Sequence, residues 1–453
     1  MYSGLLCFFL CFFENQIDEH IDFVKGEEGE RIGQWVHAFE STGFSGSVLA
    51  AKDGKVVAAI GAGYCDLEYC EPITPSSLFE LASISKPITS ICVLKLVEQA
   101  KIRLDCPISS YLDDVPANCR AITVRDLLQH TSGISPTNVE EGSIINTIKK
   151  IFSRGPEYTP GSRFEYWNQG YAVLSELISR CSGIDYTEFC RNELFDPAGM
   201  KSTCFTGDLL PNGAIVTVGK SIFGEPRSAL DHPYGAYDLR YRGMGGVVSN
   251  VWDLWRLENV LHGKSMLTDV SKQMMFQPGK NDYALGWFVK QNKHGQLMQY
   301  HSGSVRGFSC VLIRYPESKG FITVLCNSSD AQPQEMARDI EDLLFSRKPN
   351  RELPPNPVDE KLRRLLAGVY RASSGAESKI SIEGNVTRIL IGGKHPNWPS
   401  MHGTLGLGND GKLVLYEPNS ISEFAVTMTA SGTVESFVLD AIEFKRQNEL
   451  KTK

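Results

Sequence analysis

A serine and a lysine, Ser83 and Lys86, stand three residues apart where an apolar helical pattern begins. Side chains at positions i and i+3 share one face of a helix, so the two can meet. A serine hydroxyl needs a base to become nucleophilic, and a lysine serves as that base only when burial or nearby positive charge lowers its pKa. The pair therefore predicts a catalytic nucleophile beside its proton acceptor, although the same spacing also occurs in ordinary helix starts.

Two further motifs follow in order along the chain. Tyr166-Trp167-Asn168 precedes an apolar periodic run at 172–178, and His301-Ser302-Gly303-Ser304 precedes a strand-like stretch at 308–315. Together the motifs resemble the serine β-lactamase and penicillin-binding superfamily, in the branch that holds class C β-lactamases, D-aminopeptidases, D,D-carboxypeptidases and related esterases. The resemblance covers roughly residues 40–345 and includes supporting phrases at 44–50, 125–133, 244–249 and 285–287.

This resemblance implies roles for the residues of the first and third motifs. Ser83 resembles the acylated nucleophile, at the first position of its helix, and its own backbone N–H faces the developing oxyanion. The backbone N–H of Ser304 is the second expected oxyanion donor. At Gly303 we expect a side chain to obstruct the approach of the substrate. Lys86 takes the Ser83 proton, or holds the charge that lets another group take it.

The second motif supplies the other candidate base. A phenol beside lysine-type charge has its ionised form favoured, which would let Tyr166 act near neutral pH. Asn168 is expected to hydrogen-bond Lys86 and the substrate amide. The sequence leaves open whether Lys86 or Tyr166 is the general base.

The substrate-facing positions depart from the β-lactamase pattern. Where those enzymes commonly carry Lys-Thr-Gly, this chain has His301, whose imidazole is mostly neutral at pH 7. Antibiotic hydrolysis is therefore not the expected main role. Arg306 could restore a charge that binds a carboxylate, or could be a solvated surface group. Trp167 is larger than the usual residue at its position and either narrows the acyl pocket or packs outward.

Other catalytic and cofactor motifs are absent from the sequence. The histidines show no metal-ligand spacing, and no Cys-x-x-Cys occurs, so no metal or cofactor is implied. There is no Gly-x-Ser-x-Gly and no Walker-type phosphate loop. His130, within the phrase at 125–133, is interpreted as structural.

Composition is that of a globular protein, with 453 residues, 42% apolar and 22% charged residues. The net charge of −7 is mild and gives no reason to expect nucleic acid as a partner. The expected partner is a small ester, peptide or β-lactam-like substrate, and a homo-oligomer stays open.

The location of the protein stays open as well. Several of the twelve cysteines lie in apolar runs, which favours reduced thiols and a cytoplasmic setting, although Cys65 and Cys70 could pair across a turn. The apolar run at 5–13 has the length of a signal-peptide core but lacks a preceding positive charge and a cleavage site. A degenerate signal, a packed extension and a wrongly chosen start codon are alternatives there, and export or membrane association stays open.

The patterning predicts an α+β fold, with an antiparallel sheet flanked by helices and an all-helical subdomain. Residues 1–30 form an N-terminal extension, with a helix predicted from about 17 to 40, and 31–345 form the hydrolase domain. Strands are predicted at 46–51, 56–61, 284–291, 296–301, 309–315 and 321–327, with helices at 83–100 and 334–345.

A proline-rich linker at 346–358 leads to a small domain at 359–453. Its short alternating segments resemble the lipocalin-like antiparallel β-barrel that some members of the branch carry. Strands are predicted at 379–382, 386–391, 412–416, 423–429 and 436–444.

The sequence thus predicts a metal-free serine hydrolase that forms an acyl-enzyme on Ser83. The expected substrates are small esters or peptide amides, including peptides with a D-residue. Three alternatives remain: an acyltransferase with the same intermediate, a β-lactam hydrolase, and a catalytically silent protein of the penicillin-binding type.

Overall fold

The computed structural model describes residues 17–447, except 67, 69, 114, 136–150, 153–154, 212, 221–224, 233–240, 330, 384–385, 393–400, 409, 418–419 and 440. The apolar run at 5–13 lies outside the described residues. Among the helices of the described part, none combines the length and apolar character needed to cross a membrane.

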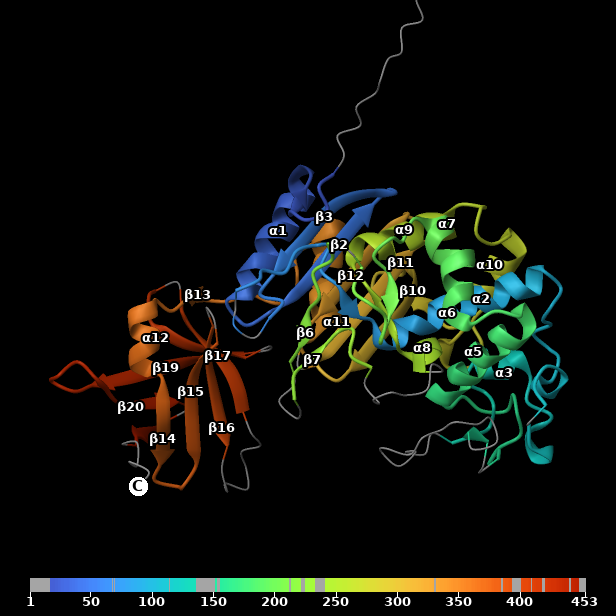
Figure 1. Cartoon of the computed structure of the whole chain (residues 1–453). Coiled ribbons are helices and arrows are strands. Elements are labelled where there is room, and N and C mark those ends of the chain that lie inside the picture. The colour runs from blue at the N-terminus through green and yellow to red at the C-terminus, as the bar shows by residue number, and fades with distance from the viewer. Residues whose placement is uncertain are drawn as a thin grey trace, which may run out of the picture.

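A seven-stranded antiparallel sheet forms the centre of the larger domain, in the order β1-β3-β2-β12-β11-β10-β9 (Figure 1). Its strands are β1 (Phe23–Val24), β2 (Gly46–Lys52), β3 (Lys55–Ala62), β9 (Phe288–Gln291), β10 (Leu297–Val305), β11 (Phe308–Tyr315) and β12 (Gly320–Cys326). The central strands β2, β11 and β12 are buried almost throughout. This burial explains why their sequences are near-continuous apolar runs.

Helices cover both faces of this sheet. On one face, α1 (Gly26–Glu40) and α11 (Pro333–Leu344) pack against alternate strand residues such as Val48 and Val324. The intervening residues, such as Leu49 and Leu325, belong to the larger core on the other face, together with α2 (Ser85–Glu98) and α9 (Val251–His262). The predicted α+β class is confirmed.

The helical subdomain lies beside the sheet, at the right of Figure 1. Besides α2 it contains α3 (Val124–Leu128), α5 (Asn168–Ser182), α6 (Tyr186–Cys190), α7 (Asp196–Ala198), α8 (Tyr241–Met244) and α10 (Asp269–Phe276). Short strands β4 (Phe79–Glu80), β5 (Cys204–Phe205) and β8 (Val247–Ser249) form a small sheet at its edge, and β6 (Val218–Gly219) pairs with β7 (Arg227–Ser228). Helix α2 contacts α5, α6 and α8, so this helix joins the subdomain to the sheet.

The predicted helix from 17 to 40 is wrong over its first part. Phe23 and Val24 form the edge strand β1, and Ile17 and Ile21 are 43% and 61% exposed rather than buried on a helix face. Gly26 has a φ of 72°, a left-handed conformation that ends any continuous helix there. The apolar spacing before Gly26 was therefore not the stripe of a helix.

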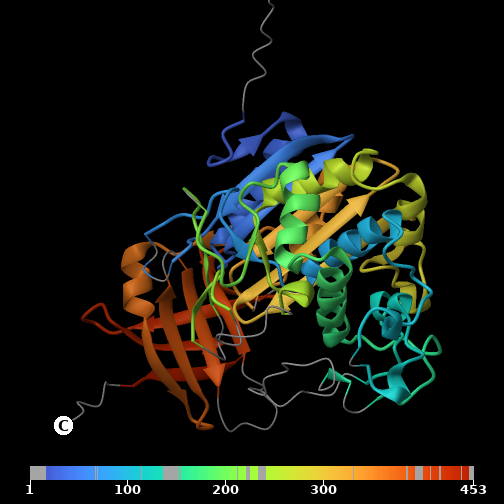
Figure 2. The same cartoon turned by 45° about the vertical axis from the view of Figure 1, so that its right-hand side comes forward.

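Eight antiparallel strands near the C-terminus close into a barrel through the pairing of β17 with β18 (Figure 2). They are β14 (Gly368–Ala372), β15 (Glu377–Glu383), β16 (Val386–Gly392), β17 (Met401–Leu407), β18 (Leu413–Glu417), β19 (Ser420–Met428), β20 (Val434–Leu439) and β21 (Ile442–Arg446), preceded by α12 (Glu360–Leu366). The predicted barrel is confirmed, and closure removes the free strand edges.

Three details of the barrel differ from the sequence prediction, the first being that β14 was not among the predicted strands. The single strand predicted at 436–444 is a hairpin of β20 and β21, with Ala441 at a φ of 64° in its turn. Strand β17 was not predicted, because its two glycines weaken the strand pattern.

The barrel contacts the C-terminal end of α1. The Tyr416 ring packs edge-on against Phe39 at 6.2 Å, and the Thr404 hydroxyl donates to the Thr42 carbonyl at 3.1 Å. The connecting segment is itself held, since the guanidinium of Arg351 lies 4.2 Å from the Phe39 ring centre. A short strand, β13 (Asn356–Pro357), adds to β17.

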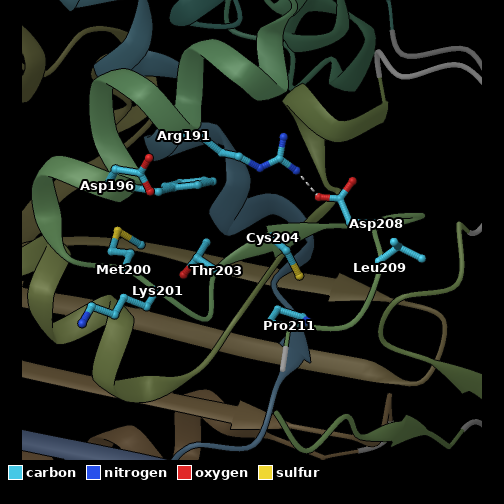
Figure 3. A pocket seen from close by; sticks show the side chains of 10 residues that line it. Arg191, Asp196, Met200, Lys201, Thr203, Cys204, Asp208, Leu209 and Pro211 are labelled. Atoms are coloured by element: carbon cyan, nitrogen blue, oxygen red, sulfur yellow. Dashed lines mark hydrogen bonds and ion pairs between the residues drawn. The ribbon is translucent and has the colours of Figure 1, made fainter. Parts of the chain in front are cut away.

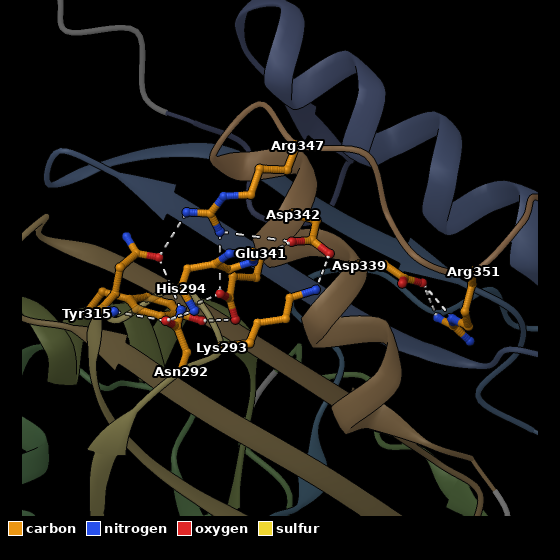
Figure 4. A network of polar contacts seen from close by, with 10 residues as sticks. Asn292, Lys293, His294, Tyr315, Asp339, Glu341, Asp342, Arg347 and Arg351 are labelled. Carbon is orange, nitrogen blue, oxygen red and sulfur yellow. Dashed lines mark hydrogen bonds and ion pairs between the residues drawn. The ribbon is translucent and has the colours of Figure 1, made fainter.

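Polar contacts fix α11 to the end of the sheet (Figure 4). Asp342 accepts from Lys293 at 2.9 Å and lies 3.2 Å from the His294 ring nitrogen, while Glu341 accepts from the Tyr315 hydroxyl at 2.9 Å. The His294 ring therefore has the Asp342 carboxylate as its partner.

The ten cysteines within the described residues are free thiols. Cys65 contacts the Ser77 hydroxyl and the Pro72 carbonyl, so the Cys65–Cys70 disulfide weighed from the sequence is absent.

Candidate active site

Ser83 lies in a single 3-10 turn, Ala82–Ile84, immediately before α2 begins at Ser85. The sequence prediction that Ser83 opens the α-helix is therefore wrong by two residues. The turn is strained, because Ala82 has a φ of 48°. Ser83 is half-buried, and Lys86 is completely buried one turn further on.

The Lys86 side chain joins three parts of the site. Its Nζ lies 2.9 Å from Ser83 Oγ, 2.8 Å from Asn168 Oδ1 and 2.9 Å from the Met244 carbonyl oxygen. Segments separated by up to 158 positions therefore converge on one amine. The predicted meeting of Ser83, Lys86 and Asn168 is observed.

Burial lowers the pKa of Lys86 well below its usual value. A neutral amine donates two hydrogen bonds and keeps one lone pair. The two oxygens of Asn168 and Met244 can accept those hydrogens, which leaves the lone pair for the Ser83 hydroxyl. The geometry thus fits a lysine that receives a proton from serine.

Tyr166 also reaches the nucleophile. A hydrogen bond with Ser83 opposes a larger effect of burial, and the net result raises the pKa of Tyr166 above its usual value. The Lys86 Nζ lies 4.9 Å from the Tyr166 ring centre. The expectation that neighbouring charge favours the ionised phenol is wrong, because burial of both groups outweighs it.

Asn168 is the first residue of α5 and is exposed. Its oxygen faces Lys86, and its exposure leaves the amide available to a ligand. Trp167 is directed into the core, where its ring lies 5.8 Å from that of Phe152. It therefore does not pack outward, and it is a core residue of the helical subdomain.

Gly303 lies on β10, where this strand passes next to the turn that carries Ser83. A Cβ atom at Gly303 would come within 2.2 Å of the Leu81 carbonyl oxygen and 3.1 Å of the Ala82 Cβ. The reason for glycine is thus close backbone packing, rather than the space for substrate that we expected. Ser304, the next residue, is exposed.

We predict that Gly303→Ala lowers both stability and activity, because β10 must move away from Leu81 to admit the methyl group. Shifts of this kind typically cost about 1–3 kcal/mol of unfolding free energy. Urea unfolding and ester hydrolysis measure the two effects, with Ser302→Ala on the same strand as the control. Wild-type values for Gly303→Ala would contradict the close approach of strand and turn.

His301 does not offer a free polar atom at the site. Its ring is buried, Nδ1 donates to the Ser302 carbonyl at 2.7 Å, and Nε2 accepts from the Tyr283 hydroxyl at 3.1 Å. Burial lowers the pKa of His301 to about 3. The imidazole is thus neutral, as expected, but it supports β10 from within rather than facing a substrate.

Arg306 occupies the two-residue turn between β10 and β11 and is exposed. Its charge acts on Glu80, whose pKa burial raises to about 8 against the opposing effects of the Tyr241 hydrogen bond and of nearby arginines. The role of Arg306 toward a substrate carboxylate stays a prediction.

Sequence reasoning missed two partners of the site. One is the Met244 carbonyl oxygen: residues 244–249 were recognised as part of the family resemblance, but no role was predicted for this atom. The other is the aromatic group of Tyr171, Tyr283 and His130 behind Tyr166. A backbone carbonyl has no sequence signature, and the aromatic residues come from three separate segments.

No cluster of three or more potential metal ligands occurs among the described residues. A hollow elsewhere is lined by ten residues between 191 and 211, where Arg191 pairs with Asp208 (Figure 3). None of the predicted catalytic residues lines it, so this hollow is separate from the Ser83 site.

The chain is similar in sequence to known penicillin-binding proteins. Penicillin-binding protein 4* of Bacillus subtilis (strain 168) is 27% identical over 369 residues, which cover 75% of this chain and 81% of that protein. Putative penicillin-binding protein PbpX of the same strain is 29% identical over 288 residues, covering 62% of this chain and 70% of that protein.

Solved structures share the fold. The octameric penicillin-binding protein homologue from Pyrococcus abyssi has a TM-score of 0.62 at 22% identity, over 92% of this chain and 99% of that chain. The D-amino acid amidase from Ochrobactrum anthropi SV3 has a TM-score of 0.59 at 21% identity, over 71% and 99%. The Beta-lactamase family model matches residues 37–345, most of the chain, and this chain therefore belongs to that family, within the serine β-lactamase/transpeptidase-like superfamily.

Proposed function

We propose that this protein is a serine hydrolase that forms an acyl-enzyme on Ser83 and releases the acyl group to water. The observation that carries the proposal is the position of the Lys86 amine, which is buried and lies 2.9 Å from Ser83 Oγ with no carboxylate among its three hydrogen-bond partners. A buried lysine without a carboxylate partner lowers the stability of the fold when it is charged. A catalytic role therefore explains this lysine better than a role in stability.

In the acylation step, neutral Lys86 accepts the Ser83 proton while Oγ attacks the carbonyl carbon of the substrate. The carbonyl oxygen becomes an oxyanion, which the backbone N–H groups of Ser83 and Ser304 stabilise. The carbon–nitrogen or carbon–oxygen bond to the leaving group then breaks, and the leaving group takes up a proton.

Tyr166 supplies that proton path in our proposal. Its neutral phenol donates a proton to the leaving group. The resulting phenolate then takes a proton from protonated Lys86 beside Ser83, which returns Lys86 to its neutral form. Water then attacks the acyl-enzyme by the same route in reverse: its proton passes through Tyr166 to Lys86, and Lys86 returns a proton to Ser83 Oγ as the serine is expelled and the acid product is released. Asn168 holds the Lys86 amine and a substrate amide in place.

The substrates we propose are small esters and peptide amides, including D-residue amides. The similarity in fold to a D-amino acid amidase supports the amide class. The neutral His301 supports it as well, because it stands at the position of the lysine that binds a β-lactam carboxylate and carries no charge. Transfer of the acyl group to an acceptor other than water remains the alternative outcome. Penicillin-binding relatives make β-lactams suitable covalent probes.

The test is a panel of p-nitrophenyl esters, D- and L-amino-acid p-nitroanilides and the chromogenic β-lactam nitrocefin. We expect turnover of esters or D-amino-acid anilides to exceed that of nitrocefin. Product analysis with and without added hydroxylamine separates hydrolysis from acyl transfer. Absence of turnover on the whole panel, together with absence of labelling by a fluorophosphonate, would refute the proposal.

A further inference from the structure

His130 holds the chain on both sides of Tyr166. The backbone N–H of Glu165 donates to the His130 carbonyl at 2.8 Å, and the backbone N–H of Trp167 donates to His130 Nδ1 at 3.1 Å. The imidazole also packs on the phenol between them, with ring centres 4.2 Å apart and planes tilted by 37°. One residue therefore restrains both the backbone and the ring of Tyr166.

The loop that carries His130 is itself firmly held. Asp126 forms a capping box with Thr123 at the start of α3 and accepts from the Thr131 hydroxyl at 2.9 Å. The Thr131 N–H donates to the Asp126 carbonyl at 2.8 Å. His130 sits between these anchors with a φ of 56°, a conformation that few residues other than glycine, asparagine, aspartate and histidine adopt.

The contacts of His130 fix its tautomer. A backbone N–H can only donate, so Nδ1 is an acceptor and the ring proton resides on Nε2. Burial is the main reason why the pKa of His130 lies well below its usual value, so the ring stays neutral. The buried Nε2 has no hydrogen-bond partner among the described residues.

The unpaired Nε2 argues that His130 is not present only to fill space in the core. A phenylalanine would fill the same space without leaving a buried donor unsatisfied, which costs about 1–3 kcal/mol. What histidine adds is the acceptor for the Trp167 N–H, combined with a flat ring against the phenol. Both of these features act on the placement of Tyr166.

We propose that His130 is a positioning residue that sets the Tyr166 hydroxyl against Ser83. This inference rests on the proposed function of Tyr166 and deepens it. His130 touches neither Ser83 nor Lys86 through any described hydrogen bond, so it acts through Tyr166. Its loss is expected to lower the rate of the chemical step rather than substrate binding.

Two substitutions separate the features of His130. His130→Asn tolerates the positive φ and retains an acceptor but removes the ring. His130→Phe retains the ring but removes the acceptor. We expect each to lower kcat for a p-nitrophenyl ester by about 10- to 100-fold with KM nearly unchanged, since small misplacements of a reacting group have effects of this size.

A double-mutant cycle with Tyr166→Phe distinguishes positioning from general damage. In the Tyr166→Phe background, the hydroxyl to be placed is gone, so each His130 substitution should change kcat by less than about threefold. Measurements are made well below the lowest melting temperature of the six proteins, and either His130 variant suffices if the other does not fold. An equal loss in both backgrounds, or no loss in the wild-type background, would overturn the inference while leaving the proposed function intact. A wild-type protein without Ser83-dependent turnover would refute the proposed function itself, and this inference with it.

Discussion

Ser83→Ala is expected to abolish covalent labelling by a fluorescent β-lactam or a fluorophosphonate. Turnover of the best ester should fall by a factor on the order of 10⁴ or more, because no other group can form the acyl intermediate. Gel fluorescence and intact-protein mass measure the labelling, and ester hydrolysis measures the turnover. Both effects follow from the position of Oγ, within hydrogen-bond distance of Lys86.

The thermal melt of Ser83→Ala should stay close to that of the wild type. Ser83 is half-buried in a one-turn 3-10 helix, and its hydroxyl contacts catalytic groups rather than the packed core. Ser179→Ala, which changes a serine on α5 that bonds only within its own helix, is the matched control and should keep labelling and turnover. Labelling that persists in Ser83→Ala would identify another residue as the nucleophile.

The central sheet could be predicted from the sequence because its strands are buried on both faces. Runs such as those of β11 and β12 must be apolar throughout, and that pattern is visible without a structure. The region around β1 shows the limit of the method. Its apolar spacing fitted a helix, but the left-handed backbone at Gly26 and pairing with β3 produced a strand.

The site could be predicted as a set of residues but only partly as a set of roles. Ser83, Lys86, Tyr166 and Asn168 were identified from two short motifs, and the fold brings them together. The requirement for glycine at 303 could not be derived, because it depends on the approach of a strand to the backbone of Leu81, 222 positions earlier.

The electrostatics of the site had to come from the structure for the same reason. The family resemblance suggested that lysine-type charge beside Tyr166 would favour its ionised form. Burial instead disfavours the charged form of both residues, and burial is a property of the packed protein. This result favours Lys86 over Tyr166 as the proton acceptor in our proposal.

That assignment predicts a distinctive pH dependence for Lys86. Catalysis needs the neutral amine, so kcat/KM of the wild type should rise with pH through the lowered pKa of Lys86 and reach a plateau above it. Lys86→Met should lose a factor of about 10² to 10⁴ in turnover, the usual contribution of one proton acceptor. The residual activity of Lys86→Met should not show this rise of kcat/KM with pH. Lys86→Arg, which keeps a cation that cannot deprotonate, should be as inactive as Lys86→Met if proton transfer is the role.

The stability of the wild type relative to Lys86→Met should depend on pH for the same reason. Between the lowered pKa of Lys86 in the folded protein and its value of about 10.4 in the unfolded chain, the unfolded chain binds one more proton. The free energy of unfolding of the wild type, relative to Lys86→Met, therefore rises with pH by up to about 1.4 kcal/mol per pH unit in that window and levels off below it. We expect the advantage of Lys86→Met to be largest at and below the lowered pKa of Lys86 and to shrink as the solution becomes alkaline. Urea unfolding of both proteins at several pH values measures this difference, in which the contributions of all other groups cancel. A difference that does not vary with pH would mean that Lys86 stays protonated in the folded protein, and would remove it as the base that activates Ser83.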